Sequence, residues 1–241
     1  MVANANRLLK VEGSFECILV ERLNRFVIKV ILDGRTQRAY INNTGRLAQY
    51  LAKGRRGFCI RNVKSNKTDC RLFSVGKDRS AALIDTHLQM KAFEKAVEFS
   101  LIPWLKGYRI LKRNVFLDSS IIDFLLECGE KKLYLEVKSA VFLDGRFAMY
   151  PDCLSTRGRR HIERLIRHVK NGGFASILFI AAMAEAEAFR PNCYIDPVIC
   201  KLLREAHNEG VDLKCVKMCY CPEDSFIYLL DADLRVEVPP P

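Results

Sequence analysis

The chain has 241 residues, 49% of them hydrophobic, which is enough to bury the cores of two modest domains. No apolar run reaches the length of a membrane span, and the first residues lack the apolar stretch of a signal peptide. We therefore expect a cytoplasmic protein with no membrane partner. The formal net charge of +11 favours polyanions as partners.

The excess of positive charge lies in the first third of the chain. Residues 1–80 carry 17 Lys and Arg against 6 Asp and Glu, whereas residues 81–241 carry 22 of each kind. A concentrated basic region favours nucleic acid as the partner. An anionic membrane surface is less favoured, because this region shows no basic amphipathic helix with a bulky apolar face. The alternative is a basic surface that serves solubility alone.

Short apolar runs in the first 80 residues predict an all-β domain. The predicted strands cover Ser14–Glu21, Arg25–Leu32, Thr36–Ile41, Gly57–Val63 and Asp69–Val75. A short helix is predicted over Asn43–Leu51, and Gly76–Ser80 reads as a linker. Five short strands with a helix after the third are typical of a small barrel of the OB type.

Small barrels of this type bind single strands through basic grooves and stacked aromatic rings. The arginines predicted to meet nucleic acid are Arg22, Arg25, Arg38, Arg46, Arg55, Arg56 and Arg61. Tyr40, Tyr50 and Phe58 are candidates for stacking on bases, although an aromatic residue in a small barrel more often belongs to its core.

The remaining residues predict a mixed α/β domain. Helices are predicted over Leu83–Phe99, Ser155–Asn171 and Asp196–Asn208, and strands over Ser120–Glu127, Lys132–Ser139, Val141–Phe142, Phe147–Tyr150, Ala175–Met183, Val211–Cys219 and Phe226–Asp231. A helix, a meander, and then helices alternating with strands match the core of PD-(D/E)XK restriction-endonuclease-like folds, an analogy at the level of fold. The proline tail, residues 239–241, is expected to be disordered.

Two of these packed strands carry charged residues, Asp123 on the first and Glu136 and Lys138 on the second. Packed charges are costly unless they are paired or bind a metal. Two carboxylates on neighbouring strands can hold Mg²⁺ through oxygen, and Lys138 shares a face with Glu136 because strand side chains alternate. The pattern indicates a metal-dependent nuclease, with a surface ion pair between Glu136 and Lys138 as the alternative.

The segment after the meander extends this candidate site. Asp152 could add an oxygen ligand for the cation, Arg157 could clamp a phosphate, and His161, one helical turn further on, could protonate a leaving oxygen. Arg159 and Arg160 lie on the same basic helix and are predicted phosphate contacts. The alternatives are a backbone hydrogen bond for Asp152, a pair between Asp152 and Arg157, and a packing role for His161.

The chain has ten cysteines and no C-x-x-C motif. Most of them lie in apolar surroundings, so reduced, buried thiols are expected. Cys215, Cys219 and Cys221 form one cluster, for which a zinc or redox role stays open.

Several sequence blocks are more specific than these spacings. Tyr150–His161 is similar to FPDAVTxRGxKH, Leu135–Ser139 to VEVKS, Ser120–Leu125 to SRIDFL and Asn42–Gly45 to PNTG, all of them motifs of the sugar fermentation stimulation protein (SfsA) family. The resemblance spans most of the chain. Ile121 stands where the family's SRID has its arginine, and Arg113 where many members carry an acid.

This resemblance implies an OB-like N-terminal domain, residues 1–80, and a nuclease-like α/β domain, residues 81–241. It implies a DNA-binding protein with a regulatory role in sugar metabolism. Nothing in the sequence resembles a helix-turn-helix, so the binding is expected to be weakly sequence-specific. The alternative is a Mg²⁺-dependent nuclease that cleaves DNA or RNA through Asp123, Glu136 and Lys138. The oligomeric state stays open, with a homodimer as one option.

Overall fold

The structure, a computed structural model, describes residues 5–61, 67–77 and 79–238. The predicted disordered tail and the end of the strand predicted over Gly57–Val63 lie outside these ranges. In chain order the elements are β1 (Asn6–Lys10), β2 (Ser14–Asn24), β3 (Val27–Leu32), β4 (Arg35–Tyr40), β5 (Arg56–Arg61), β6 (Cys70–Lys77), β7 (Ser80–Leu83), α1 (Thr86–Glu98), η1 (Pro103–Leu105), β8 (Arg109–Leu117), β9 (Ser120–Cys128), β10 (Lys131–Ala140), β11 (Phe142–Asp144), β12 (Phe147–Tyr150), α2 (Thr156–Lys170), β13 (Phe174–Ala181), β14 (Ala188–Pro191), α3 (Pro197–Asn208), β15 (Asp212–Cys221) and β16 (Phe226–Asp231).

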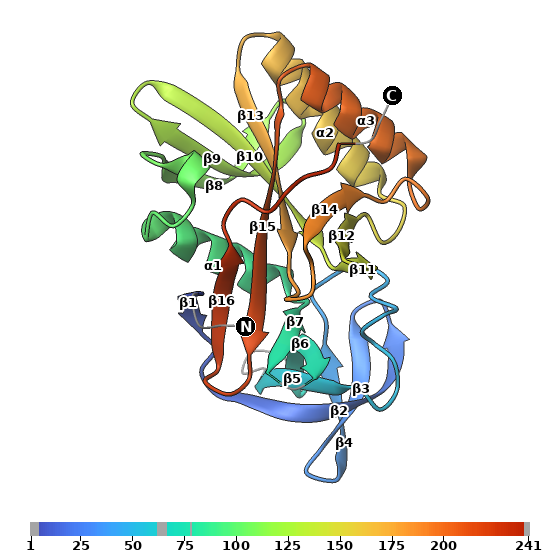
Figure 1. The fold of residues 1–241 in the computed structure, drawn as a ribbon. Helices are drawn as coiled ribbons and strands as arrows, with labels where there is room; N and C mark the ends of the chain where they lie inside the picture. Colours follow the sequence, from blue (N-terminus) through green and yellow to red (C-terminus); the bar gives the residue numbers. More distant parts are fainter. Residues whose placement is uncertain (1–4, 62–66, 78, 239–241) are drawn as a thin grey trace.

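Strands β2 to β6 form the N-terminal barrel (Figure 1). Antiparallel pairs join β2 to β3, β3 to β4, β2 to β5 and β5 to β6, and a parallel pair of β4 with β6 closes the barrel. Apolar residues at alternate positions, among them Leu19, Ile28 and Val30, fill its interior. The predicted OB-type barrel is confirmed.

Two local predictions for this domain are wrong. No helix forms over Asn43–Leu51, because polar groups of that segment bond to distant parts of the chain, such as the Asn43 side chain to the Ile84 carbonyl. The predicted linker Gly76–Ser80 instead contributes Gly76, Lys77 and Ser80 to the antiparallel pair of β6 and β7, in which Gly76 lies opposite Ala81. A Cβ on Gly76 would lie 2.5 Å from the Ala81 Cα, so this close pairing needs glycine.

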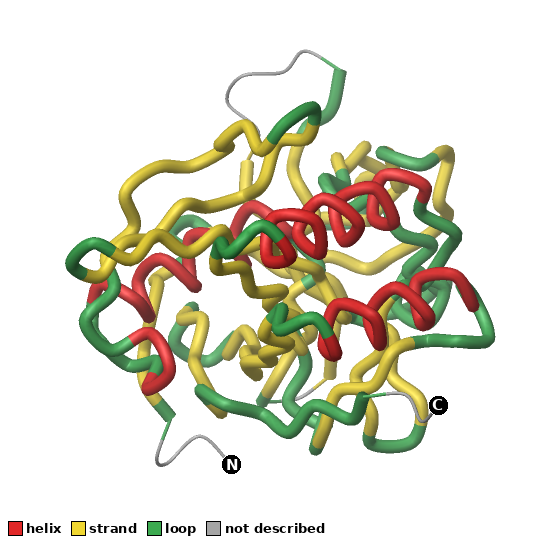
Figure 2. The backbone as a smooth tube through the Cα atoms, turned by 90° about the horizontal axis from the view of Figure 1, so that it is seen from above, coloured by secondary structure: helices red, strands yellow, loops and turns green. Residues whose placement is uncertain are grey.

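The second domain is built on a mixed sheet. Strands β8, β9 and β10 form an antiparallel meander, and β10, β13 and β15 run parallel. Phe93 of α1 packs on Phe124, whereas His161 of α2 contacts Glu136, so the two helices cover opposite faces. Helices α2 and α3 lie side by side on their face (Figure 2). The predicted mixed α/β architecture is confirmed.

The three helices begin at polar caps. Asp85, Ser155 and Asp196 each accept a hydrogen bond from the backbone N–H three residues further on. The predicted helix over Leu83–Phe99 is therefore shorter than expected, because Asp85 ends the extended chain before it.

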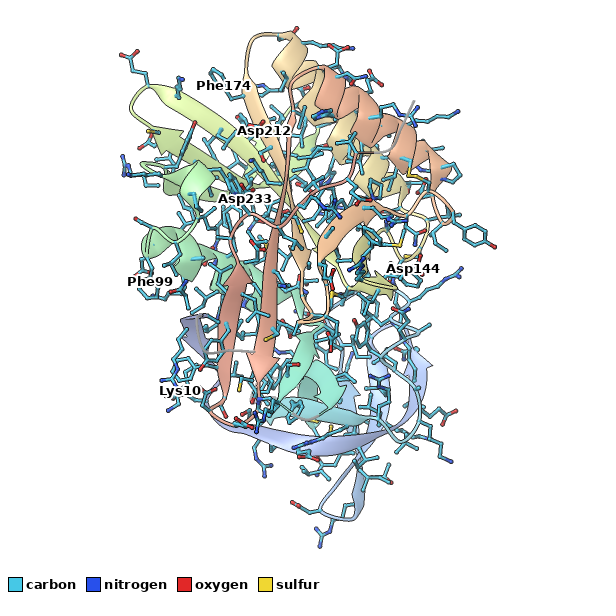
Figure 3. The ribbon with its side chains drawn as sticks, viewed as in Figure 1. Lys10, Phe99, Asp144, Phe174, Asp212 and Asp233 are labelled. Atoms are coloured by element: carbon cyan, nitrogen blue, oxygen red, sulfur yellow. A yellow bond between two sulfur atoms is a disulfide. The ribbon has the colours of Figure 1, made fainter. Side chains whose placement is uncertain are left out.

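Within the described part of the chain, the two domains share one sheet of 13 strands, in which β7 pairs with β15 and β1 with β16. The antiparallel strands β15 and β16 extend between the second domain and the barrel (Figure 1). Phe174, the first residue of β13, lies at the far end of the second domain, and Asp144, the last of β11, lies near the barrel (Figure 3). Since β10 and β13 are parallel, the C-terminal end of β10 points toward the barrel.

Strands β1, β7, β8 and β14 were not predicted from the sequence. Strand β8 is an edge strand whose exposed positions are mostly basic or polar, so it lacks the apolar alternation that marks a strand. Strand β14 joins β11 and β12 in a separate three-stranded sheet.

The cysteine prediction needs one correction. Cys193 and Cys200 form a disulfide that joins the loop before α3 to its first turn, and only the remaining eight are free. Cys215, Cys219 and Cys221 are buried, and burial raises the pKa of the Cys219 thiol to about 12, which makes this thiol a poor metal ligand or nucleophile.

None of the helices in the described ranges combines the length and apolar character needed to cross a membrane.

Candidate functional site

The predicted acid pair lies where two strands of the sheet separate. Strands β9 and β10 pair as far as Leu135 and Phe124; beyond that point β9 continues with β8 and β10 with β13. Val137 lies beyond the pairing of β10 with β9, and its N–H donates to Asp123 Oδ2 at 2.8 Å. Asp123 lies next to Phe124 and Glu136 next to Leu135, the last paired residues, so the two acids share a face of the sheet where the strands separate.

Glu136 is almost completely buried and has partners for only one of its oxygens. Its Oε1 accepts from Lys138 Nζ at 2.6 Å and contacts His161 Nδ1 at 2.5 Å. Its Oε2 is buried and has no hydrogen-bond partner among the described residues. Lys138 is also buried, and its ammonium lies 6.0 Å from the centre of the Tyr150 ring. An unpartnered buried carboxylate oxygen is costly, so this oxygen is a candidate ligand for a cation.

The pKa values of the trio reflect this crowding. Burial raises the pKa of Asp123 to about 6, and the neighbouring charge of Glu136 adds to the effect. Burial also opposes ionisation of Glu136, but the Lys138 ammonium and His161 outweigh it and hold the Glu136 pKa below its usual range. For Lys138, burial lowers the pKa, but the neighbouring Glu136 carboxylate raises it by more. The pKa of Lys138 therefore lies above its ordinary value.

The trio lies in a cleft of about 300 Å³. The surrounding wall comes from four other parts of the chain: Thr44 of the barrel, Thr86, Gln89 and Met90 of α1, Tyr150 of β12, and Ser155, Arg157 and Gly158 at the start of α2. Hydroxyl groups and one guanidinium therefore face two carboxylates. Such a lining suits a phosphate beside a cation.

His161 lies behind this cleft. Arg157 Nε donates to His161 Nε2 at 3.3 Å, so the remaining ring proton lies on Nδ1 and points at Glu136. Both ring nitrogens are thus occupied, and the side chain is buried. This arrangement suits a residue that orients Glu136, in line with the packing alternative, rather than the predicted proton donor.

Asp152 is not brought to the acid pair. Its Oδ2 accepts from the Leu47 N–H at 3.1 Å, and a Cβ on Gly45 would clash with the same oxygen. The carboxylate therefore contacts the barrel, and not the backbone of the loop before α2 that the alternative named. Asp152 is not among the described residues that line the cleft of Asp123 and Glu136, so this contact does not support the prediction of Asp152 as a cation ligand.

Four of the predicted nucleic-acid contacts hold the protein itself together. Arg22 donates to the carbonyls of Asn24, Arg25, Gly45 and Arg46, and Arg25 donates to that of Thr44. Arg159 makes a bidentate pair with the buried Asp196, the N-cap of α3, and Arg56 pairs with Glu16.

The other predicted contacts leave charge at the surface. Arg38, Arg46 and Arg160 are exposed, and Arg55 lines a groove of about 670 Å³ between the domains. Of the aromatic residues proposed for stacking, Tyr50 and Phe58 belong to the core.

Thr44, Thr86 and Gln89 were not predicted to be parts of the cleft. Gln89 left the clearest signal, because it is a polar residue among the buried positions of the amphipathic helix α1. Its Nε2 donates to the Leu83 carbonyl at 2.6 Å and to Ser139 Oγ at 2.9 Å, while its buried Oε1 has no partner.

These residues fit a divalent cation. Hard cations prefer oxygen, and here an unpartnered Glu136 oxygen shares a cleft with the Asp123 carboxylate, whose raised pKa a cation would lower. Within residues 5–61, 67–77 and 79–238, no group of three or more His, Cys, Asp and Glu side chains is arranged to hold a metal. The remaining ligands would come from water, amide oxygens or a phosphate.

Two family models match this chain. One, described as the SfsA N-terminal OB domain, covers residues 20–84, and the other, described as the sugar fermentation stimulation protein RE domain, covers residues 87–224. Sugar fermentation stimulation protein homologs of Pyrococcus furiosus and Archaeoglobus fulgidus are 43% and 39% identical to it over 232 residues. Both alignments span 96% of this chain and 100% of the relative.

A solved structure is similar over nearly the whole chain. It is described as Pyrococcus furiosus SfsA in complex with Ca²⁺, and it matches with a TM-score of 0.92 and 40% sequence identity. The match covers 97% of this chain and 100% of that one.

Proposed function

Because the chain belongs to the sugar fermentation stimulation protein family, and its two domains enclose an acid-lined cleft, we propose that it is a nucleic-acid-binding nuclease that depends on a divalent cation. The observation that carries this proposal is the unpartnered, buried Oε2 of Glu136 in one cleft with Asp123 and Lys138. We take Mg²⁺ as the physiological cation, DNA or RNA as the substrate and the cytoplasm as the compartment.

Asp123 and Glu136 would hold the cation. When bound, a divalent cation activates a water molecule and neutralises charge on the scissile phosphate. Lys138 places a fixed positive charge beside Glu136, where it stabilises negative charge that develops on a phosphate. Arg157 uses its Nε to donate to His161, and its two terminal nitrogens can donate to a phosphate oxygen.

The solved structure of Pyrococcus furiosus SfsA is a complex with Ca²⁺, which supports the cation. Ca²⁺ and Mg²⁺ both take carboxylate oxygens, and Ca²⁺ commonly occupies Mg²⁺ sites without supporting their chemistry. The exposed arginines of the barrel and of α2 support the proposal of a nucleic-acid substrate. Arginine side chains of this kind contact the phosphates and position the protein on the strand.

A second candidate is a DNA-binding protein that does not cleave and that regulates sugar metabolism. The observation in its favour is that Lys138 and His161 both bind Glu136 Oε1, so this carboxylate has a charged partner and a further hydrogen-bond partner without a cation. In that case the acid pair would serve binding or regulation alone.

Cleavage assays separate the two candidates. We expect labelled single- or double-stranded DNA or RNA to be cut in Mg²⁺ or Mn²⁺ and left intact in Ca²⁺ or EDTA. Asp123→Asn should lose at least about 100-fold in rate, because one cation ligand is removed, while keeping its affinity for the substrate in EDTA. Binding without cleavage under any of these conditions would favour the second candidate.

A further inference from the structure

One wall of the cleft belongs to the other domain. Thr44, from the barrel loop between β4 and β5, lines the same cleft as Asp123, Glu136 and Lys138. Thr44 is exposed, whereas its neighbours Asn43 and Gly45 are buried. A lone exposed threonine between buried neighbours presents its side chain to solvent at a point the backbone fixes.

Several contacts hold this loop from the side of the barrel. Arg22 donates to the carbonyls of Gly45 and Arg46, and Arg25 Nε donates to that of Thr44 at 3.1 Å. The Asn43 side chain accepts from the Gly45 N–H at 2.9 Å, which tightens the turn around Thr44. Two guanidinium groups thus lie on the carbonyls of the loop, and their charge adds to the attraction for an anion.

Further contacts hold the loop from the side of the second domain. Asp152 accepts from the Leu47 N–H, and a Cβ on Gly45 would clash with the Asp152 carboxylate. The two domains are therefore in such close contact here that only glycine fits at position 45. Asn42 donates to Asp85 Oδ1 at 3.0 Å and accepts from the Thr86 N–H, which ties the loop to the start of α1. Gln49 makes two hydrogen bonds to the backbone of Leu143.

We propose that the loop 42–47 is a part of the nucleic-acid site, in which Thr44 binds a phosphate of a strand lying between the two domains. Arg22 and Asp152 are positioning residues that hold the loop against the cleft. The Thr44 hydroxyl donates to a phosphate oxygen in the cleft that Arg157 also lines. This inference rests on the proposed function for its site, but it adds that the barrel contributes directly to that site.

The test compares four variants of the full chain: Thr44→Ala, Thr44→Ser, Arg22→Gln and Arg35→Gln. Arg35→Gln is the matched control, because Arg35 is an exposed arginine of the barrel at the far β3–β4 hairpin and its loss changes the net charge as Arg22→Gln does (Figure 1). Affinity for a labelled oligonucleotide is measured in EDTA by fluorescence anisotropy, and kcat and KM are measured in Mn²⁺.

We expect Thr44→Ala to weaken oligonucleotide binding in EDTA about tenfold, because one hydrogen bond to phosphate is lost, and Thr44→Ser to restore it. Arg22→Gln should lower kcat by about 10- to 100-fold, since a displaced loop misplaces the strand. Arg35→Gln should stay within about twofold of the wild type in kcat.

Failure of this inference and failure of the proposed function are distinguishable. Equal binding by the wild type and Thr44→Ala, or equal losses in Arg22→Gln and Arg35→Gln, would overturn the role of the loop even if the wild type cleaves. If the wild type does not cleave, the arm in EDTA still decides, because weaker binding by Thr44→Ala with rescue by Thr44→Ser supports the loop as a binding site. Thr44→Ala removes only a hydroxyl and a methyl group at an exposed position, so it should fold even where Arg22→Gln does not.

Discussion

Replacing Glu136 by Gln should lower the free energy of unfolding by about 3 kcal/mol. The substitution keeps the size of the side chain but leaves the buried Lys138 ammonium without the carboxylate that holds it at 2.6 Å. Removing one partner of a buried ion pair costs more than the pair itself contributes, because the other charge stays buried. Urea unfolding at pH 7.5 without divalent cations measures the effect.

Two controls make this prediction sharp. The double variant Glu136→Gln/Lys138→Met should recover most of the lost stability, because no unpaired charge then remains. Glu187→Gln, which removes the carboxylate of a pair with Arg146 in which both side chains are mostly exposed, should change the unfolding free energy by less than about 0.5 kcal/mol. If Glu136→Gln were as mild as Glu187→Gln, the buried pair would not be the anchor of the site.

Replacing Asp123 by Asn should stabilise the cation-free protein by about 2–3 kcal/mol at pH 8. The folded protein raises the pKa of Asp123 from its ordinary value of 3.8 to about 6. Between these values the folded state holds a proton that the unfolded state has released, so stability falls as the pH rises from about 4 to 6. Above the folded pKa the full cost remains, and Asn avoids it.

The pH dependence of this effect provides its own control. Well below pH 3.8, Asp123 is protonated in both the folded and the unfolded state, so wild type and Asp123→Asn should have nearly equal unfolding free energies there. Asn keeps an oxygen that can accept from the Val137 N–H, so that hydrogen bond does not confound the comparison. A variant less stable than the wild type at pH 8 would show that the carboxylate supports the fold and does not strain it.

A divalent cation should invert the order of stability of the wild type and Asp123→Asn, so that the wild type becomes the more stable of the two. Binding to the folded wild type adds stability by mass action, whereas Asp123→Asn lacks one ligand. A site that weakens the fold until its ligand binds is expected of residues retained for function rather than for stability.

The sequence was informative about the trio because charge interrupts otherwise apolar strands. Asp123 lies between Ile122 and Phe124, both fully buried, and Lys138 has apolar strand neighbours on the adjacent β13. Such charges in packed strands can be recognised without a structure. The separation of β9 from β10, which gives Asp123 its backbone partner, could not be predicted, because it depends on how far the register of two strand pairs extends.

Contacts between the domains were the part that local patterns could not predict. Leu47 and Asp152 are 105 residues apart in the chain, yet their hydrogen bond decides that Asp152 faces the barrel and not the cation site. Arg22 looked like a phosphate contact because a charge pattern does not reveal that backbone carbonyls of a distant loop surround the guanidinium. The same loop contacts override the helix propensity of Asn43–Leu51.

The most direct test of the central claim, that Asp123 and Glu136 hold a divalent cation, is a calorimetric titration of the protein with Mn²⁺ at pH 7.5. We expect the wild type to bind Mn²⁺, Asp152→Asn to bind it with the same affinity, and Asp123→Asn and the stable double variant Glu136→Gln/Lys138→Met to lose at least about 100-fold in affinity. Wild-type affinity in the Asp123 and Glu136 variants, or its loss in Asp152→Asn alone, would contradict the account.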